Sequence, residues 1–478
     1  MHQLSPSESE LLAAESVTNL GHQSLVLELD DNRDGERITL DRLRAAIESS
    51  LHLVVGLRRR VVEVPLGLDD PWWIEDPHFD LDYHIRHLAV PGSSDPHALE
   101  QLLARLHERP LDRNRPLWEL YLIENPDGPT NIFVKVHIVL IEELGPLGPL
   151  APVLAGTPTD LDQARPARWQ PDMVPTDSEL LVKAAWSLGR SPTRAARHVL
   201  GGISRVPLLG EVSRLVLASA RSRSHPIELA RNDRAVPRVS FNRTVSAHRR
   251  VARVTLPLDR LRDIHRMREV RFHDVLLTVI SGALRHWMVL NDELPSEPLV
   301  ALTPLLVDSD GDDELGAALV PLATHRHDAL QRLADVSDAM SQLTMDIDPK
   351  SATDIARRAE PPSALAGTAA RLLVTTGAGL RLLPPFNVYV VNIPGRDEGP
   401  IAGHPIVREH AMVPIVDGIG LSISAISHDD RVDLTLVADR DLVPDLRMLA
   451  DRFEIELEEL HRVSRSRQRR SGRRKRAS

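Results

Sequence analysis

The residue types that most often carry chemistry are unevenly represented in this chain of 478 residues. It has no cysteine, which excludes disulfides, thiolate metal sites and a cysteine nucleophile. It has 21 histidines, but His404, His410 and His428 lack the spacing of metal ligands, so we predict no metal site. The acidic run 308–314 lacks the full calcium-loop pattern and is interpreted as a solvated loop. The sequence contains neither a glycine-rich phosphate loop nor a Gly-x-Ser-x-Gly turn.

Helices and strands that could position a site alternate along both halves of the chain. Residues 98–107 place leucines at helical spacing, and the β-branched run 131–139, which contains His137, is typical of a buried strand. A second region opens with a strand at 250–256 and an apolar helix at 274–287. Further strands are predicted at 299–302, 386–392, 421–426 and 432–438, before a terminal amphipathic helix at 441–460. The length exceeds one ordinary core, so we predict two α/β lobes.

One basic segment separates the two regions of alternating helices and strands, and another ends the chain. Residues 178–223 carry many more basic than acidic side chains and predict amphipathic helices, which either lie on a membrane interface or link two domains. The last segment, 462–478, has nine Lys or Arg and no acid, and we predict a disordered tail. The predicted organisation is an N-terminal lobe at 1–160, a basic linker and connector at 161–242, a C-terminal lobe at 243–461 and the tail.

Composition indicates where in the cell the chain is found and what its basic tail could bind. Hydrophobic residues at 42% and charged residues at 26% are typical of a soluble globular protein, and no apolar run reaches the length of a membrane span. The N-terminus lacks a secretory pattern, so we expect a cytoplasmic protein. The tail either serves solubility or contacts a polyanion. It has no aromatic residue to stack on bases, so anionic lipid is preferred over nucleic acid, and no specific nucleic acid is expected.

Several ordered segments carry a family resemblance. They are FDLDYHIR at 79–86, RPLDRNRPLWELYLIE at 109–124, FNVYVVNIPG at 386–395, and the run 421–445 with VADRDLVPD. Together they resemble the bacterial wax ester synthase/diacylglycerol acyltransferase family from about residue 4 to residue 460. The resemblance implies two chloramphenicol-acetyltransferase-like lobes with a channel between them. It also implies acyl-CoA as co-substrate, diacylglycerol or a long-chain alcohol as acceptor, and no other cofactor.

The motif of that family is altered in this chain. The family pattern is His-His-x-x-x-Asp-Gly, in which the second histidine is taken as the general base that accepts the proton of the attacking alcohol. By position His137 matches the first histidine, Ile138 stands in place of the base, Glu142 replaces the aspartate and Glu143 replaces the glycine. The resemblance therefore nominates His137 and Glu142 as catalytic candidates, although an isoleucine cannot accept a proton.

A strand geometry argues against His137 as a substitute base. Neighbouring side chains of a strand point to opposite faces, so His137 shares a face with Phe133 and Lys135 and turns away from the face of Ile138. We therefore favour a packed or hydrogen-bonded role for His137.

Three residues are assigned to the substrate channel by the resemblance, namely Ile138, Asp274 and Asn392. Two further positions depart from the family pattern. Ala317 stands where the family usually has an asparagine, and His273 precedes Asp274 where the family has an asparagine. For the turn that begins at Asn392, a strand end is an equally good interpretation.

Two functions remain open at this point. The first is an O-acyltransferase of triacylglycerol or wax ester synthesis with reduced activity, in peripheral contact with the inner membrane face or a lipid droplet. The second is a catalytically inactive relative that binds acyl lipids or partners an active acyltransferase. A condensation-type enzyme uses the same histidine motif, so the same substitution at Ile138 counts against it.

Overall fold

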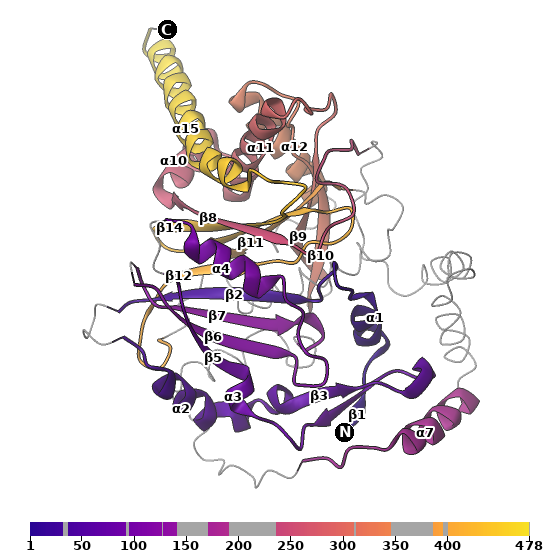
Figure 1. Ribbon diagram of the computed structural model, residues 1–478. Helices are drawn as coiled ribbons and strands as arrows, with labels where there is room; N and C mark the ends of the chain where they lie inside the picture. Colours follow the sequence, from indigo (N-terminus) through magenta and orange to yellow (C-terminus); the bar gives the residue numbers. More distant parts are fainter. Residues whose placement is uncertain are drawn as a thin grey trace.

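A computed structural model describes residues 1–31, 37–91, 95–126, 128–140, 171–190, 236–309, 312–345, 386–394 and 400–477. Two large sheets lie one above the other, and a small sheet lies at the N-terminal end (Figure 1). One buried cluster contains residues of both large sheets, and a second lies within the C-terminal lobe. This arrangement confirms the predicted mixed α/β class with two lobes.

The N-terminal lobe is built on a five-stranded sheet of order β12-β2-β7-β6-β5. Its strands are β2 (His22–Leu29), β5 (Ile85–Ala89), β6 (Trp118–Glu124), β7 (Asn131–His137) and β12 (Ile406–Met412). Helix α4 (Ala98–His107) covers one face through Leu103 and Leu106, in one cluster with Val251 of the other lobe. The same lobe also contains α2 (Leu40–Ser50) and α3 (Leu81–His84).

Strand β12 belongs to the N-terminal sheet, although it lies within residues 243–461, the range predicted for the C-terminal lobe. It pairs antiparallel with β2 of the N-terminal sheet, with His410 opposite Val26. The physical reason is that an edge strand leaves unpaired N–H and C=O groups, and β12 satisfies those of β2. Sequence order therefore does not separate the two lobes completely.

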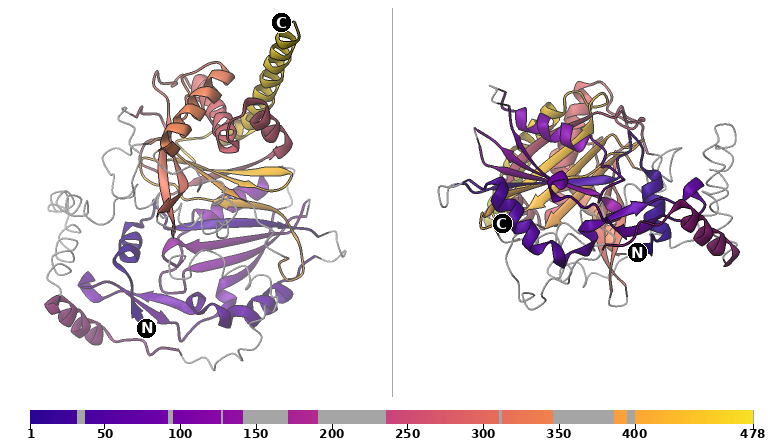
Figure 2. Two further views of the ribbon diagram at one scale, coloured as in Figure 1. Left: turned by 180° about the vertical axis from the view of Figure 1, so that it is seen from behind. Right: turned by 60° about the horizontal axis from the view of Figure 1, so that its bottom comes forward.

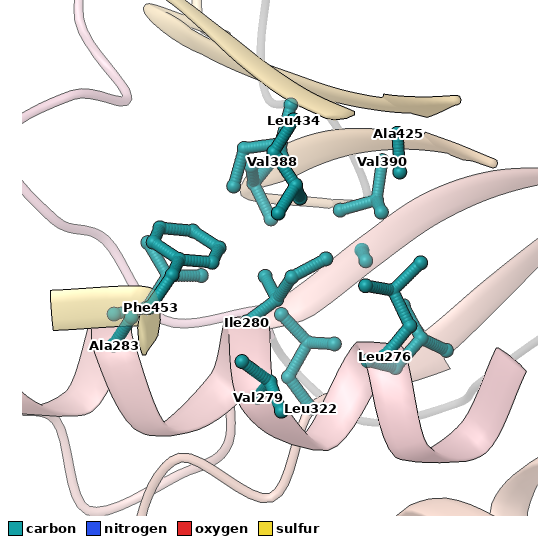
Figure 3. Close-up of a cluster of buried hydrophobic side chains, with 14 of the residues drawn as sticks. Leu276, Val279, Ile280, Ala283, Leu322, Val388, Val390, Ala425, Leu434 and Phe453 are labelled. Carbon is teal, nitrogen blue, oxygen red and sulfur yellow. The ribbon is translucent and has the colours of Figure 1, made fainter. Parts of the chain in front are cut away.

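The C-terminal lobe has a six-stranded sheet of order β10-β9-β11-β13-β14-β8. The strands are β8 (Arg249–Pro257), β9 (Val300–Ser309), β10 (Asp312–Pro321), β11 (Val388–Pro394), β13 (Leu421–Ser427) and β14 (Arg431–Asp439). Helices α10 (Leu258–Arg268), α11 (Phe272–Leu290), α12 (Ala329–Met345) and α15 (Leu446–Ala477) cover one face (Figure 1). Ile280 of α11 packs between Val388 of β11 and Phe453 of α15 (Figure 3).

Two sequence predictions differ from the structure in this lobe. The acidic run 308–314 is interpreted from sequence as a loop, but Ser309 and Asp312 pair across the β9–β10 hairpin. The basic end of the chain, predicted to be a disordered tail, continues α15 as far as Ala477. Arg and Lys are good helix formers, and a helix already nucleated on the core extends at low cost.

The N-terminal end carries a three-stranded sheet of order β1-β4-β3, formed by His2–Gln3, Trp72–Glu75 and Arg59–Val62. Helices α1 (Pro6–Ala14) and α7 (Asp177–Arg190) and the short 3-10 turns η1 (Leu51–Leu53), η2 (Val55–Arg58) and η3 (Pro65–Gly67) also belong to this lobe. The amphipathic helix predicted from residue 178 corresponds to α7, whereas residues 191–223 of the predicted basic region lie outside the described residues.

Charged contacts join the lobes. Arg253 of β8 donates to Glu28 of β2 at 2.5 Å and lies 3.5 Å from Glu100 of α4. Asn19 and Asp417 exchange side-chain and backbone hydrogen bonds at 3.1 and 2.9 Å. Within the described part of the chain, no helix combines the length and apolar character needed to cross a bilayer.

Candidate functional site

Strand β7 sends alternate side chains to two different environments, as the sequence predicts. Phe133 lies in the cluster under α4, together with Leu103 of that helix. Val134, Val136 and Ile138 lie in the larger cluster on the other face. The histidine motif therefore begins where β7 ends, and the side chains of its first two residues, His137 and Ile138, point to different faces of the sheet.

His137 is held by contacts to both of its ring nitrogens. The backbone N–H of Val139 donates to Nδ1 at 3.2 Å, so Nδ1 is the unprotonated nitrogen and Nε2 carries the proton. Nε2 faces Glu15 Oε2 at 3.4 Å, and the side chain is 1% exposed. Neither nitrogen presents a lone pair toward an incoming alcohol in this arrangement.

Glu15 is the residue that fixes this histidine, and the sequence analysis did not identify it. It follows α1, and its Oε2 accepts from Arg113 Nη2 at 2.7 Å and Nε at 3.0 Å. The backbone N–H of Gly21 donates to Oε1 at 3.3 Å. Burial raises the pKa of Glu15, but the hydrogen bonds from His137 and Arg113 and the charge of Arg113 outweigh burial and lower the pKa to about 2.

Gly21 makes the close approach of the two chains possible. A Cβ atom added there would lie 2.5 Å from Nε2 and 2.9 Å from Cε1 of His137, closer than real Cβ contacts occur. The backbone O of Gly21 also accepts from the N–H of Ile138 at 2.9 Å. Arg113 adds a bond to the backbone O of Leu12 at 2.7 Å. A buried carboxylate thus joins α1, the start of β2, the end of β7 and the segment 109–124 that carries the family resemblance.

Ile138 occupies the expected position of the base and is itself 1% exposed. It belongs to the buried cluster that also contains Val391 and Ile393 of β11 from the other lobe. No atom of its side chain can take a proton. The replacement positions Glu142 and Glu143 lie outside the described residues.

A second buried polar group lies beside this one on the α4 side of the sheet. The Lys135 ammonium contacts Glu119 at 3.1 Å and donates to the backbone O atoms of Leu106 and Arg109 at 3.2 and 3.0 Å. All three of its protons have acceptors, so Lys135 anchors the end of α4 and the start of the segment that leads to Arg113. It is not available as a nucleophile in this state.

Two further histidines are buried near Lys135. His22 Nε2 contacts the backbone O of His107 at 2.7 Å, and Ser24 Oγ contacts His107 Nδ1 at 2.9 Å. Burial, reinforced by the charge of Lys135, lowers the pKa of His22 well below its usual value. Burial and the charges of Arg249 and Lys135 lower the pKa of His107 to about 3. Both rings are therefore neutral at physiological pH. Among the described residues, no group of three His, Asp, Glu or Cys could hold a metal ion.

The remaining predicted channel residues have separate local contacts. Asp274 Oδ2 accepts from Ser337 Oγ at 2.9 Å and from the backbone N–H of Arg271 at 3.2 Å, which makes Asp274 a capping residue of α11. Burial raises the pKa of Asp274. Asn392 Oδ1 accepts from Ser427 Oγ at 3.4 Å on the neighbouring strand β13. The contacts of these two residues do not bring them to Ile138, and their assignment to a channel stays a prediction.

The two sheets, with β12 crossing from the second half of the chain to the first sheet, form a mixed α/β fold of two lobes. The solved wax ester synthase/diacylglycerol acyltransferase from Marinobacter aquaeolei VT8 superposes with a TM-score of 0.64, over 97% of this chain and 100% of that one, at 21% identity. At that identity the likeness establishes the fold alone.

Sequence comparison establishes the family. The wax ester synthase/diacylglycerol acyltransferase catalytic domain matches residues 4–276, and the C-terminal domain of the same family matches residues 313–461. A "putative diacylglycerol O-acyltransferase" of Mycobacterium tuberculosis is 30% identical, over 96% of this chain and 99% of its own length. A Mycobacterium bovis protein of the same description is 28% identical, over 96% and 91%. The chain belongs to the wax ester synthase/diacylglycerol acyltransferase family.

Proposed function

We propose that this chain transfers an acyl group from acyl-CoA to diacylglycerol or a long-chain alcohol, at a rate well below that of relatives with both motif histidines. Family membership over nearly the whole chain supports the reaction class. The observation that carries the reduced rate is the pair of contacts that occupies both nitrogens of His137, next to a buried Ile138.

The chemistry explains why this position matters. The acceptor hydroxyl attacks the thioester carbonyl, the C–S bond breaks, and CoA leaves as a thiolate. The hydroxyl proton must pass to a base as the new C–O bond forms. A positioned base contributes about 10²–10⁴-fold to such reactions, and this is the factor we expect the chain to lack. Without it the proton passes to water, and the fold contributes by holding the two substrates together.

The second candidate is a non-catalytic relative that binds acyl lipids or an active acyltransferase. The locked state of His137 favours it, because a histidine with a protonated Nε2 aimed at a carboxylate serves structure rather than proton transfer. For either candidate we propose peripheral contact with lipid, at the inner face of the membrane or on a lipid droplet, because the substrates are insoluble in water.

Turnover of the purified chain with palmitoyl-CoA and dioleoylglycerol tests the proposal, with release of CoA thiol as the readout. We expect slow turnover in the parent and an increase of at least about tenfold in Ile138→His, with a rate that rises as pH passes through about 6.5. Ile138→Gln is the matched control, since it is polar and of similar length but cannot act as a base. His137→Ala should leave the rate per folded molecule unchanged.

Three outcomes decide between the candidates. An Ile138→His variant that gains no more than Ile138→Gln contradicts the missing-base explanation. No CoA release by the parent and by Ile138→His, together with saturable binding of palmitoyl-CoA, supports the non-catalytic candidate. A His137→Ala variant that folds but loses all turnover would make His137 the base after all.

A further inference from the structure

Helix α15 packs on the C-terminal lobe along its first half and projects from that lobe along its second half. Phe453, Leu457 and Leu460 are buried in the apolar cluster of the lobe, and Ser464 is buried as well. Beyond Ser464 the helix continues to Ala477, past the ends of the neighbouring helices α10, α11 and α12 (Figures 1 and 2). This projecting part is about 20 Å long at the rise of an α-helix.

The projecting half of α15 is strongly basic in a chain that is otherwise acidic. Residues 462–478 contain nine Lys or Arg and no Asp or Glu. Without these nine positive charges, the formal net charge of −10 becomes −19. A helix C-terminus favours cations, but this effect is confined to the last turn. The basic residues begin at Arg462, about four turns before the helix ends, so the helix dipole does not account for them.

The first charges of this half have no acidic partner. Three exposed arginines of α15 form no ion pair with any residue that the structure describes, namely Arg462, Arg465 and Arg467. The carboxylates on the preceding turn pair elsewhere. Glu458 lies 3.4 Å from Arg260 of α10, and Glu459 lies 3.8 Å from Arg452. The positive charge of the three arginines is therefore open to an external partner.

The end of α10 adds a further cation at the base of the projecting half. Arg268 Nη2 donates to the backbone O of Ser464 at 3.0 Å. Burial lowers the pKa of Arg268, and the charge of Arg467 lowers it further. The charge that acts on Arg268 is thus another cation. We call the surface formed by Arg268, Arg462, Arg465 and Arg467 the cationic surface.

The chemistry of the cationic surface selects its partner. After Val463 the sequence has no apolar side chain larger than alanine, so there is no seam for a coiled coil with a second copy. It also has no aromatic ring on which a base could stack. Anionic headgroups of a bilayer require neither, since they attract Lys and Arg through charge alone. The acidic remainder of the chain is repelled by the same bilayer, so the field turns the cationic surface toward it.

We propose that the cationic surface docks the chain on a bilayer that contains anionic lipid, with headgroup phosphates bound by the arginines of α15 and by Arg268 of α10. The proposal rests on the proposed function, because a water-insoluble acceptor must be met at its own surface. It adds which end of the molecule faces the lipid. It also predicts binding that weakens with salt, because the Debye length is only about 8 Å at physiological ionic strength.

Vesicle flotation of the full chain tests the proposal. The vesicles contain phosphatidylcholine with a small share of dioleoylglycerol, with or without phosphatidylglycerol, at low and high salt. The parent should float with phosphatidylglycerol at low salt, and much less at high salt or on phosphatidylcholine alone. At low salt, Arg462→Gln/Arg465→Gln/Arg467→Gln should reduce the partition coefficient for the anionic vesicles at least about tenfold.

A matched control separates this surface from net charge. Three exposed arginines elsewhere on the molecule also have no ion pair among the described residues, namely Arg42, Arg105 and Arg243. Their joint replacement by glutamine changes the net charge equally and should leave flotation close to that of the parent. Circular dichroism and urea unfolding check that both variants fold like the parent.

The orientation of the docked chain gives an independent readout. The chain has no cysteine, so a fluorescent label can be placed at a single introduced thiol. Ser466→Cys labels the exposed side of α15 beside the cationic surface. Val182→Cys labels α7, where Val182 is 59% exposed and which lies at the opposite end of the molecule from the end of α15 (Figures 1 and 2). A lipid with a quencher in its headgroup should quench the label at position 466 more strongly.

Failure of this proposal stays distinguishable from failure of the acyltransferase proposal. Flotation and quenching require no turnover, so they decide the docking even if the chain releases no CoA. If the chain does release CoA, the α15 triple variant should keep the parent rate with acceptor in neutral detergent micelles. Its rate on anionic vesicles should fall together with its binding.

Several results would overturn the docking proposal. Equal flotation of the parent with neutral and anionic vesicles would assign binding to apolar contact. An unchanged α15 triple variant, equal losses in both triple variants, or stronger quenching at position 182 would show that another surface faces the lipid. Displacement from anionic vesicles by a short RNA at equal phosphate concentration would make nucleic acid the preferred partner. A lipid-free dimer at low salt that the α15 triple variant dissolves would show that an acidic surface of a second copy takes that place.

Discussion

Glu15→Gln tests the buried carboxylate that fixes His137. The pKa of Glu15 falls from 4.5 to about 2 in the folded chain because His137 and Arg113 outweigh the opposing effect of burial. Each pKa unit corresponds to about 1.4 kcal/mol, so ionisation of Glu15 stabilises the fold by about 3 kcal/mol at neutral pH. The amide of glutamine has no charge and only one acceptor oxygen for these donors, so we expect the variant to lose at least about this free energy of unfolding.

The pH dependence has a definite sign. The folded pKa lies below the unfolded value, so the contribution of Glu15 is present above about pH 4.5 and is lost as pH falls toward 2. At pH 3.5 about 2 kcal/mol of it remains. Urea unfolding of parent and variant at pH 7 and pH 3.5, followed by circular dichroism, should therefore give a difference that narrows as the solution becomes acidic.

Glu63→Gln is a control on the same arginine. Glu63 lies 3.4 Å from Arg113 but its side chain is 67% exposed, so its loss should cost less than about 0.5 kcal/mol. Equal losses in Glu15→Gln and Glu63→Gln would refute the argument from burial. A difference between parent and Glu15→Gln that widens on acidification would refute the direction of the pKa change.

Further predictions concern the neighbours of this carboxylate. Gly21→Ala should destabilise the chain by about 1–3 kcal/mol in urea unfolding, because the new methyl displaces the buried ring of His137. Gly128→Ala, whose methyl meets only a flexible amide, should cost less, and equal costs would contradict the packing argument. Lys135→Met should cost about 3–5 kcal/mol, because it removes the buried cation nearest to Glu119, which keeps only Arg86 at 3.6 Å and the Tyr121 hydroxyl at 2.8 Å, and because the backbone O atoms of Leu106 and Arg109 lose their donor. Adding Glu119→Gln should recover part of that loss in the same assay. If the losses of unfolding free energy in the two single variants simply add up in the double variant, Lys135 and Glu119 are not coupled.

Local elements with strong periodicity are predictable from this sequence. The helix expected at residues 98–107 coincides with α4 (Ala98–His107), and the apolar helix expected at 274–287 lies within α11 (Phe272–Leu290). Both depend on apolar residues at helical spacing, which is a property of neighbouring positions. The alternation of β7 is predictable for the same reason, because it follows from the strand geometry alone.

Elements whose fate depends on distant partners are not predictable in this way. Strand β12 has the composition of a strand, but only the free edge of β2 decides which sheet it joins. The basic end of the chain has a composition typical of disorder, and only its continuity with the packed part of α15 makes it helical.

The candidate site, too, is set partly by the sequence alone and partly by the tertiary structure. The sequence by itself determined the family and the presence of Ile138 where a histidine is expected, because residue identity at an aligned position needs no coordinates. Only the tertiary structure decided that His137 is held by Glu15, a residue far from it in the sequence. A carboxylate selects its partners through space, and the fold that brings α1, β2 and β7 together sets which charges meet inside it.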